Sequence, residues 1–196
     1  MDLRYPIGKF EFAGPATPEQ RRRWIAVVKA APAKFRAALE GLSPKQLDTP
    51  YRPGGWTVRQ VVHHLPDSHM NAFIRFKLAL TEDVPTIKPY DEKRWAELAD
   101  VRKTPVEVSL ALLGAIHERW VNLLKSLGPG DFARTFIHPE HQAPLTLEKT
   151  LALYAWHGAH HTAHVTSLSD RMGWKTPKPR AERKPGPRKA KRTRRA

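Results

Sequence analysis

Residues 146–173, TLEKTLALYAWHGAHHTAHVTSLSDRMG, contain the pattern that decides the fold. The stretch begins with Thr146, a common N-cap residue, and ends at Gly173, a common helix terminator. At about 100° per residue, Leu153, Tyr154 and Leu168 fall on one side of a helix built from this sequence. The stretch therefore predicts one long helix with an apolar stripe that faces a core.

Three earlier stretches have the same signature, a threonine followed by apolar residues at helical spacing. They are residues 17–39, 57–80 and 104–124, and we expect each helix to begin at its threonine. Pro32 and Pro66 fall inside the first two, where proline commonly kinks a helix. Four long helices in one chain of 196 residues predict an all-α protein with a single folded domain.

The segments between these helices complete the predicted architecture. Residues 82–100 are a long crossover with one short helix near residues 92–98, and this crossover is a candidate lid. Residues 132–147 alternate weakly and predict a short irregular hairpin. Four long helices with one long crossover predict a four-helix bundle, a fold whose facing helices commonly build metal sites from inward side chains.

The formal net charge of +15 is concentrated at the C-terminus. Residues 175–196 hold eleven lysines and arginines against one acidic residue, Glu182, together with several prolines. Such a segment buries too little apolar surface to order itself, so we expect residues 1–174 to fold and residues 175–196 to form a disordered basic tail. Weak, non-specific contact with nucleic-acid phosphates is the interaction that this tail could make.

Composition also limits the chemistry and the location of the protein. The sequence has no cysteine, which excludes disulfides, thiolate metal sites and cysteine nucleophiles, so a metal site must use histidine or carboxylate. No uncharged apolar run approaches the roughly 18 residues that a membrane span requires, and the N-terminus lacks a signal-peptide core. We therefore predict a cytoplasmic protein with no membrane contact.

Histidines are concentrated in the second and fourth predicted helices. On the fourth, taking His157 as zero, His161 lies at about 40°, His164 at about −20° and His160 at about −60°. His157, His161 and His164 thus share the apolar stripe, with His160 at its edge. His157 and His161 are four residues apart, so their Cβ atoms lie about 5–6 Å apart, close enough to bind one metal.

The second helix offers two candidates for a third ligand. His64 lies about 110° and His63 about 150° from the centre of the apolar stripe, whereas His69 lies within it. Because Pro66 precedes His69, its extrapolated angle is uncertain, and geometry leaves His64 and His69 both open. Either would complete a three-histidine group that leaves positions for water or substrate. The isolated histidines fit ordinary core or loop roles; they are His117, His138 and His141.

At these residues the sequence resembles the DinB-like metal-binding four-helix bundles, most closely the YfiT subgroup of proposed metal-dependent hydrolases, which are related to bacillithiol S-transferases. The resemblance spans residues 3–174 through RYPIGKF, GGWTVRQVVHHLPDSHMNAFIRFKLALTED and LYAWHGAHHTAHV. It implies His64, rather than His69, as the ligand from the second helix, with His157 and His161 as the H-x3-H pair. It also implies zinc or nickel, one ion per subunit, a homodimer and a cytoplasmic location.

These observations predict a hydrolase in which a divalent metal on three histidines activates water for attack on a small-molecule substrate. Two alternatives remain open: a metal-dependent thiol transferase of the bacillithiol type, and a non-catalytic bundle whose metal acquires a fourth protein ligand such as His69 or His164. Further polar residues follow His64 on its side of the helix and are candidates for contacts with the ligands or the substrate. They are Asp67, Ser68, Asn71 and Arg75.

Overall fold

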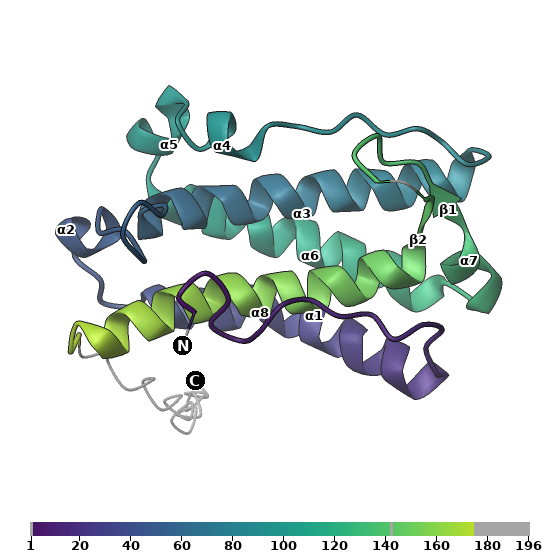
Figure 1. Cartoon of the computed structure of the whole chain (residues 1–196), viewed down its shortest axis with the longest axis horizontal. Helices are drawn as coiled ribbons and strands as arrows, with labels where there is room; N and C mark the ends of the chain where they lie inside the picture. Colours follow the sequence, from purple (N-terminus) through teal and green to yellow (C-terminus); the bar gives the residue numbers. More distant parts are fainter. Residues whose placement is uncertain (1, 142, 175–196) are drawn as a thin grey trace, which may run out of the picture.

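The computed structural model describes residues 2–141 and 143–174, which form a four-helix bundle (Figure 1). Its helices are α1 (Pro18–Leu39), α2 (Pro44–Leu47), α3 (Val58–Thr81), α4 (Glu92–Trp95), α5 (Ala99–Lys103), α6 (Val106–Ser126), α7 (Pro129–Ala133) and α8 (Leu147–Arg171). Its strands are β1 (Thr135–Phe136) and β2 (Leu145–Thr146). The four long helices α1, α3, α6 and α8 confirm the predicted fold. The predicted disordered tail, residues 175–196, lies outside the described residues.

Threonine N-caps begin three of the four long helices, as predicted. In each, the threonine hydroxyl accepts a hydrogen bond from the backbone N–H three residues later, which satisfies one of the unpaired donors of the first turn. The pairs are Thr17 with Gln20, Thr57 with Gln60, and Thr146 with Lys149. Both α1 and α3 continue through their internal prolines, Pro32 and Pro66.

The remaining prediction, that Thr104 is the N-cap of the third long helix, is wrong. α6 begins at Val106 with Pro105 as its N-cap, and no side chain caps it. Thr104 instead ends the short helix α5, because its backbone N–H donates to the carbonyl of Asp100 at 2.8 Å. The sequence missed α5, and a threonine that could begin one helix was used to end another.

The order of the long helices around the bundle places α3 beside α8. α1 packs against α6 and α8, and α3 packs against the same two helices. The crossover after α3 returns along the length of that helix, so α3 and α6 run in the same direction (Figure 1). α8 runs the opposite way and packs directly beside α3.

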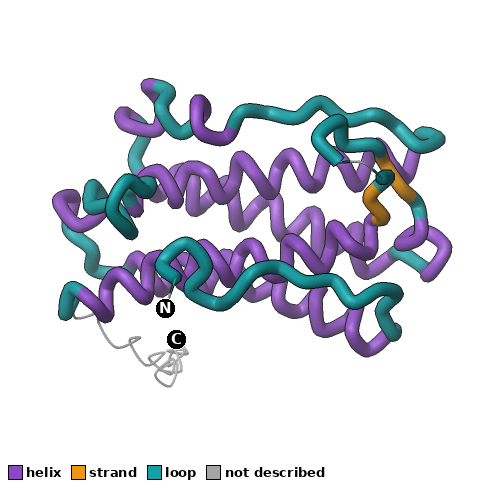
Figure 2. The backbone as a smooth tube through the Cα atoms, viewed as in Figure 1, coloured by secondary structure: helices purple, strands orange, loops and turns teal. Residues whose placement is uncertain are grey.

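The connections lie on the outside of the bundle. The predicted hairpin is confirmed: β1 and β2 pair antiparallel at one end of the bundle, with Phe136 opposite Leu145 (Figure 2). The crossover is fixed to α3 near its other end, where the Gln60 side chain donates to the carbonyl of Ala96 at 3.0 Å. Crossover and hairpin together therefore cover the open side of α3 and α8.

The N-terminal segment, residues 2–16, runs along α8 in the opposite direction (Figure 1). Backbone and ring contacts join the two along most of their length. They are Arg4 with His164, Phe10 with Trp156, and Ala16 with Glu148. No sequence pattern predicted this cover, which helps to bury His160, the residue that the helical pattern placed at the edge of the apolar stripe.

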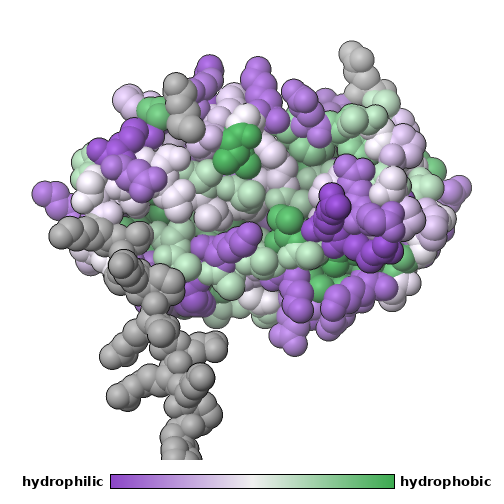
Figure 3. Space-filling view, turned by 90° about the horizontal axis from the view of Figure 1, so that it is seen from below, coloured by the Kyte–Doolittle hydropathy of each residue, from purple (hydrophilic) through white to green (hydrophobic). Residues whose placement is uncertain are grey.

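The core has two parts along the bundle. One is built around Trp120, Phe76 and Leu124, and the other around Phe35 and Leu65. On the face shown in Figure 3, hydrophilic and hydrophobic residues are interspersed. Within the described ranges, none of the helices has both the length and the apolar character that a membrane span requires.

Candidate metal centre

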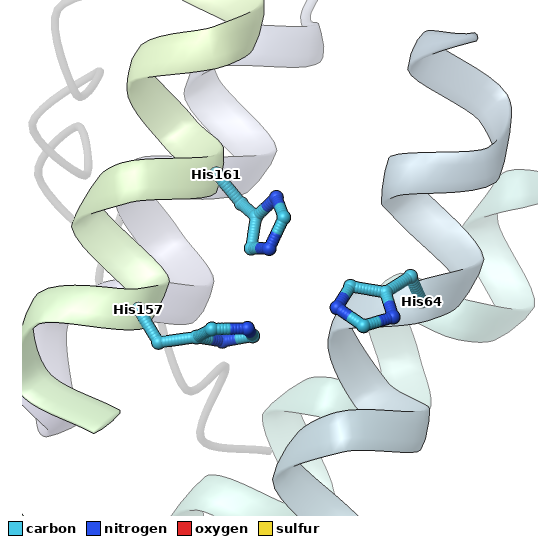
Figure 4. A group of neighbouring side chains, drawn as sticks. All are labelled: His64, His157 and His161. Atoms are coloured by element: carbon cyan, nitrogen blue, oxygen red, sulfur yellow. The ribbon is translucent and has the colours of Figure 1, made fainter. Parts of the chain in front are cut away.

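Three histidines from two facing helices come together between α3 and α8. His64 projects from α3, His157 and His161 project from α8, and their rings point toward one another (Figure 4). One ligand nitrogen from each ring can be chosen so that all three lie within 4.8 Å of one another. These are the three residues predicted as ligands, and the described residues contain no other such group of histidines and acids.

Burial keeps all three rings in the form that binds metal. Burial lowers the pKa of His64 to about 4 and holds the pKa values of His157 and His161 well below the usual range. The rings are therefore neutral near pH 7, with an available lone pair on each. Neutral imidazoles in van der Waals reach of one another fit a divalent cation, which binds only the deprotonated form.

The same burial predicts that the metal-free protein loses stability in mild acid. Burial lowers the pKa values of His64, His160 and His164 to about 4, whereas an unfolded histidine titrates near 6.5. Between these values the unfolded chain binds more protons than the folded one, so stability falls as the pH is lowered from about 6.5 toward 4. Burial raises the pKa of Asp67 to about 6, so in this range the folded chain binds one proton at Asp67 that the unfolded chain lacks. Asp67 therefore offsets part of the loss of stability.

We expect the thermal midpoint of chelator-treated protein to fall steadily between about pH 7 and pH 5, where carboxylates with ordinary pKa values stay ionised. Replacing His160 with glutamine should make that slope shallower, because one fewer buried ring then resists protonation. A midpoint that is constant over this interval would contradict the assignment of neutral buried histidines.

A line of hydrogen bonds between rings, the histidine series, fixes the orientation of His157. Nδ1 of His117 lies 2.7 Å from the carbonyl oxygen of Val28 on α1. Nε2 of His117 lies 2.8 Å from Nδ1 of His69, and Nε2 of His69 lies 3.1 Å from Nδ1 of His157. The series thus connects a backbone carbonyl of α1, through α6 and α3, to a candidate ligand on α8.

The direction of these bonds follows from the carbonyl at the end. A carbonyl only accepts, so Nδ1 of His117 carries the proton, and the Nε2 of the neutral ring must accept from His69. By the same rule Nε2 of His69 accepts from Nδ1 of His157. Nε2 of His157 is left with a free lone pair, in keeping with the usual arrangement in which a ligating histidine donates its other N–H.

His161 has a shorter support of the same kind. Nε2 of His164 lies 3.2 Å from the carbonyl oxygen of Arg4, and Nδ1 of His164 lies 3.4 Å from Nδ1 of His161. Nδ1 of His161 is therefore the donor, and its Nε2 is free. His164 also stacks on Tyr51 at 4.0 Å between ring centroids, so it supports the candidate site without belonging to the three-histidine group.

Two other histidines are more buried than the helical pattern predicts. His63 was placed farthest from the stripe, but its Nδ1 lies 2.7 Å from the hydroxyl oxygen of Ser109 on α6. His160 was placed at the edge, yet it is buried against Trp156, with the Tyr5 ring of the N-terminal segment nearby. In both cases a neighbouring segment covers a face that an isolated helix would expose.

A cavity of about 430 Å³ opens beside the three histidines. Crossover and hairpin contribute to its wall, with Tyr90 from the first and His138 from the second. Among the polar residues that follow His64, Ser68 and Arg75 line the cavity. Asp67 and Asn71 do not, and Asn71 donates instead to the backbone carbonyl of Asp67 at 2.9 Å.

The hydroxyl groups of the cavity form a small polar cluster. The hydroxyl oxygens of Ser68 and Tyr154 lie 3.2 Å apart. Burial raises the pKa values of Tyr90 and Tyr154 above the usual range, so both phenols stay protonated at neutral pH. The sequence did not indicate Tyr90 or His138, because a side chain on a connection faces the site only through the path that the connection takes.

Comparison with solved structures and relatives supports this architecture. YfiT from Bacillus subtilis, described as "a probable metal-dependent hydrolase with an unusual four-helix bundle topology", is 53% identical and aligns with a TM-score of 0.87 over 89% of this chain and 100% of that one. The four-helix bundle protein TT2238 is 22% identical, with a TM-score of 0.54 over 75% of this chain and 98% of that one, and shows the fold alone.

Sequence relatives extend over almost the same region. Proteins named "Putative metal-dependent hydrolase" from Bacillus mycoides strain KBAB4 and Bacillus cereus strain B4264 are each 58% identical over 173 residues, which cover 88% of this chain and 99% of theirs. The family model of the DinB superfamily matches residues 19–165, which contain α1 except its first residue, all of α3 and α6, and the three histidines between α3 and α8. The chain therefore belongs to the DinB superfamily.

Proposed function

We propose that the protein is a metal-dependent hydrolase in which His64, His157 and His161 bind one divalent cation, zinc or nickel. The observation that carries the proposal is the group of three imidazole nitrogens, all within 4.8 Å of one another, at the wall of a cavity. Relatives that share more than half of the sequence are named as metal-dependent hydrolases, which supports the same activity.

Three protein ligands favour a catalytic role over a structural one. Structural zinc sites usually have four protein ligands, whereas catalytic sites leave a position for water or substrate. The two histidines that could supply a fourth ligand are already engaged: His69 bonds to His117 and His157, and His164 bonds to Arg4 and His161. The non-catalytic alternative is therefore the weaker of the two.

A divalent cation at this place supplies a Lewis acid and lowers the pKa of water. The protein's own residues orient the ligands and bind the substrate. The supports on His157 and His161 hold these rings in place, and the protonated hydroxyls of Tyr90 and Tyr154 can donate hydrogen bonds to a bound substrate. Apolar side chains of the cavity wall, including Leu153 and Phe136, limit the access of bulk water to the reacting atoms.

The test is elemental analysis of the purified full chain followed by a substrate panel. We expect about one equivalent of metal per chain and metal-dependent hydrolysis of an ester, amide or phosphoester, lost with a chelator and restored by zinc or nickel. A second arm supplies a thiol and an electrophile. Thiol transfer without hydrolysis would replace the proposal by the thiol transferase alternative, and metal without either activity would favour a structural role.

A further inference from the structure

Arg75 is a positive charge in the cavity that has no carboxylate partner among the residues that the structure describes. It projects from α3, is half-buried, and lines the same cavity as the three histidines. Every ion pair found in residues 2–141 and 143–174 joins other residues. Burial of a charged group is costly unless a counter-charge compensates it, so an unpaired guanidinium in a cavity calls for an explanation.

The surroundings of Arg75 leave this charge available to a ligand. His138 on the hairpin lines the same cavity as Arg75, and burial, and after it the charge of Arg75, lowers the pKa of the His138 ring, so this ring stays neutral near pH 7. The two acidic residues of the cavity wall, Glu92 and Glu140, are exposed, and neither comes within ion-pair distance of Arg75. The interior of the cavity is therefore positive at the Arg75 end.

Helix geometry sets the distance between Arg75 and the three histidines. Arg75 follows His64 by eleven residues, which is about three turns and about 16 Å along α3. Both side chains lean toward the N-terminus of α3, and the arginine side chain is the longer of the two, so the guanidinium lies closer to the His64 ring along the helix than the Cα atoms are to each other. Both residues line one cavity, and Ser68 lies between them on the same side of α3.

We propose that the substrate carries an anionic group, a carboxylate or a phosphate, that pairs with Arg75 while its reactive centre lies at the three histidines. This inference rests on the proposed function. Guanidinium binds both anions through paired hydrogen bonds, which gives orientation as well as affinity. The substrate is then long enough to span both ends, with its middle against Leu153 and the hydroxyls of Ser68 and Tyr154.

Dicarboxylates of increasing length test the inference without knowledge of the substrate. In the zinc-loaded full chain, one carboxylate can act as the anionic ligand of the zinc and the other can reach Arg75. Titration calorimetry should show that a dicarboxylate longer than succinate binds at least about tenfold more tightly than the monocarboxylate of equal length, as expected for a charge-assisted bidentate pair. A parallel series that ends in phosphonate tells which anion Arg75 prefers.

Substitutions at Arg75 locate the effect. Arg75→Gln should remove the advantage of the dicarboxylate and leave monocarboxylate binding unchanged, and Arg75→Lys should keep part of it, because lysine retains charge but not the paired geometry. Lys77→Gln is the matched control, since Lys77 is an exposed cation on the same helix outside the cavity. The inference is overturned if both acids bind alike in the wild type, or if Lys77→Gln equals Arg75→Gln.

The metal-free protein separates this inference from the proposed function. If the metal site is right, removing zinc weakens both acids, whereas Arg75→Gln weakens only the dicarboxylate. If zinc does not change the affinity for either acid, and the affinity for the dicarboxylate still depends on Arg75, then the anion site is supported and the metal proposal fails. If zinc binds and strengthens the monocarboxylate but Arg75→Gln has no effect, the metal proposal stands and the anion site fails.

Discussion

Replacing His161 with alanine is expected to lower the metal content of the purified protein from about one equivalent to near zero. His161 supplies one of only three candidate ligands, and the two remaining imidazoles come from different helices, so the site loses its H-x3-H pair. The loss of metal affinity should exceed the roughly 10–100-fold loss that follows removal of a group that only supports a ligand. Metal-dependent hydrolysis should disappear with the metal, as measured by elemental analysis and the substrate panel.

His160 provides the matched control for this substitution. It is the neighbouring residue on α8, and its exposed fraction of 7% equals that of His161. Its ring stacks on Trp156 and lies outside the three-histidine group. His160→Ala should therefore keep the metal even if it lowers the thermal midpoint. Stoichiometric metal in His161→Ala, or equal loss in both variants, would show that the ligands are assigned wrongly.

The second large effect is expected at His69, which we interpret as a positioning residue. His69→Phe preserves a ring of similar size in the core but removes the acceptor for Nδ1 of His157. His157 can then change tautomer or rotate, and metal affinity should fall by about 10–100-fold although no candidate ligand has changed. Competition with a chelator of known affinity measures the fall.

NMR can determine which nitrogen of each ring in the histidine series carries the proton. Long-range proton–nitrogen NMR spectra of the zinc-loaded and metal-free protein should show the proton on Nδ1 in His117, His69 and His157. His69→Gln retains an acceptor and should recover part of the affinity, and His117→Phe should have a smaller effect because it lies one bond farther from the site. A His69→Phe variant with unchanged affinity and tautomers would exclude a positioning role.

The sequence predicted the features that depend on one helix alone. The long helix at residues 147–171 and the pair His157 and His161 follow from spacing within a single stretch. Threonine caps marked three helix starts because the bond is local, whereas Thr104 failed because it could equally end α5. Local rules determine whether such a bond is available, but the path of the chain determines which helix uses it.

The choice between His64 and His69 could not be made from a helical projection. That projection assumes one buried face, but α3 is covered by α6, α8 and the crossover, so His63, His64 and His69 are all buried. Resemblance favoured His64, and the structure places it in the three-histidine group. His69 faces the core as its angle predicted and supports His157 instead.

The cavity wall depended on long-range contacts that no local pattern records. Tyr90 and His138 reach it from the crossover and the hairpin, and both segments take their course from packing on the finished bundle. The role of His117 was visible only in part: it lies beside Trp120 on the apolar face of its helix, but nothing in the sequence shows that His69 is its partner. The predicted homodimer and the predicted contact of the tail with nucleic acid stay predictions.

The position of the three histidines on α3 and α8 has a consequence for folding. In the sequence, α3 precedes the long crossover and α8 follows it, so more than ninety residues separate His64 from His157. The candidate ligands therefore meet only when α8, the last long helix, docks. Closing so large a loop is slow, and no partial bundle that lacks α8 can bind the ion. Metal would therefore stabilise only the complete bundle, and its binding free energy would add to the cost of global unfolding.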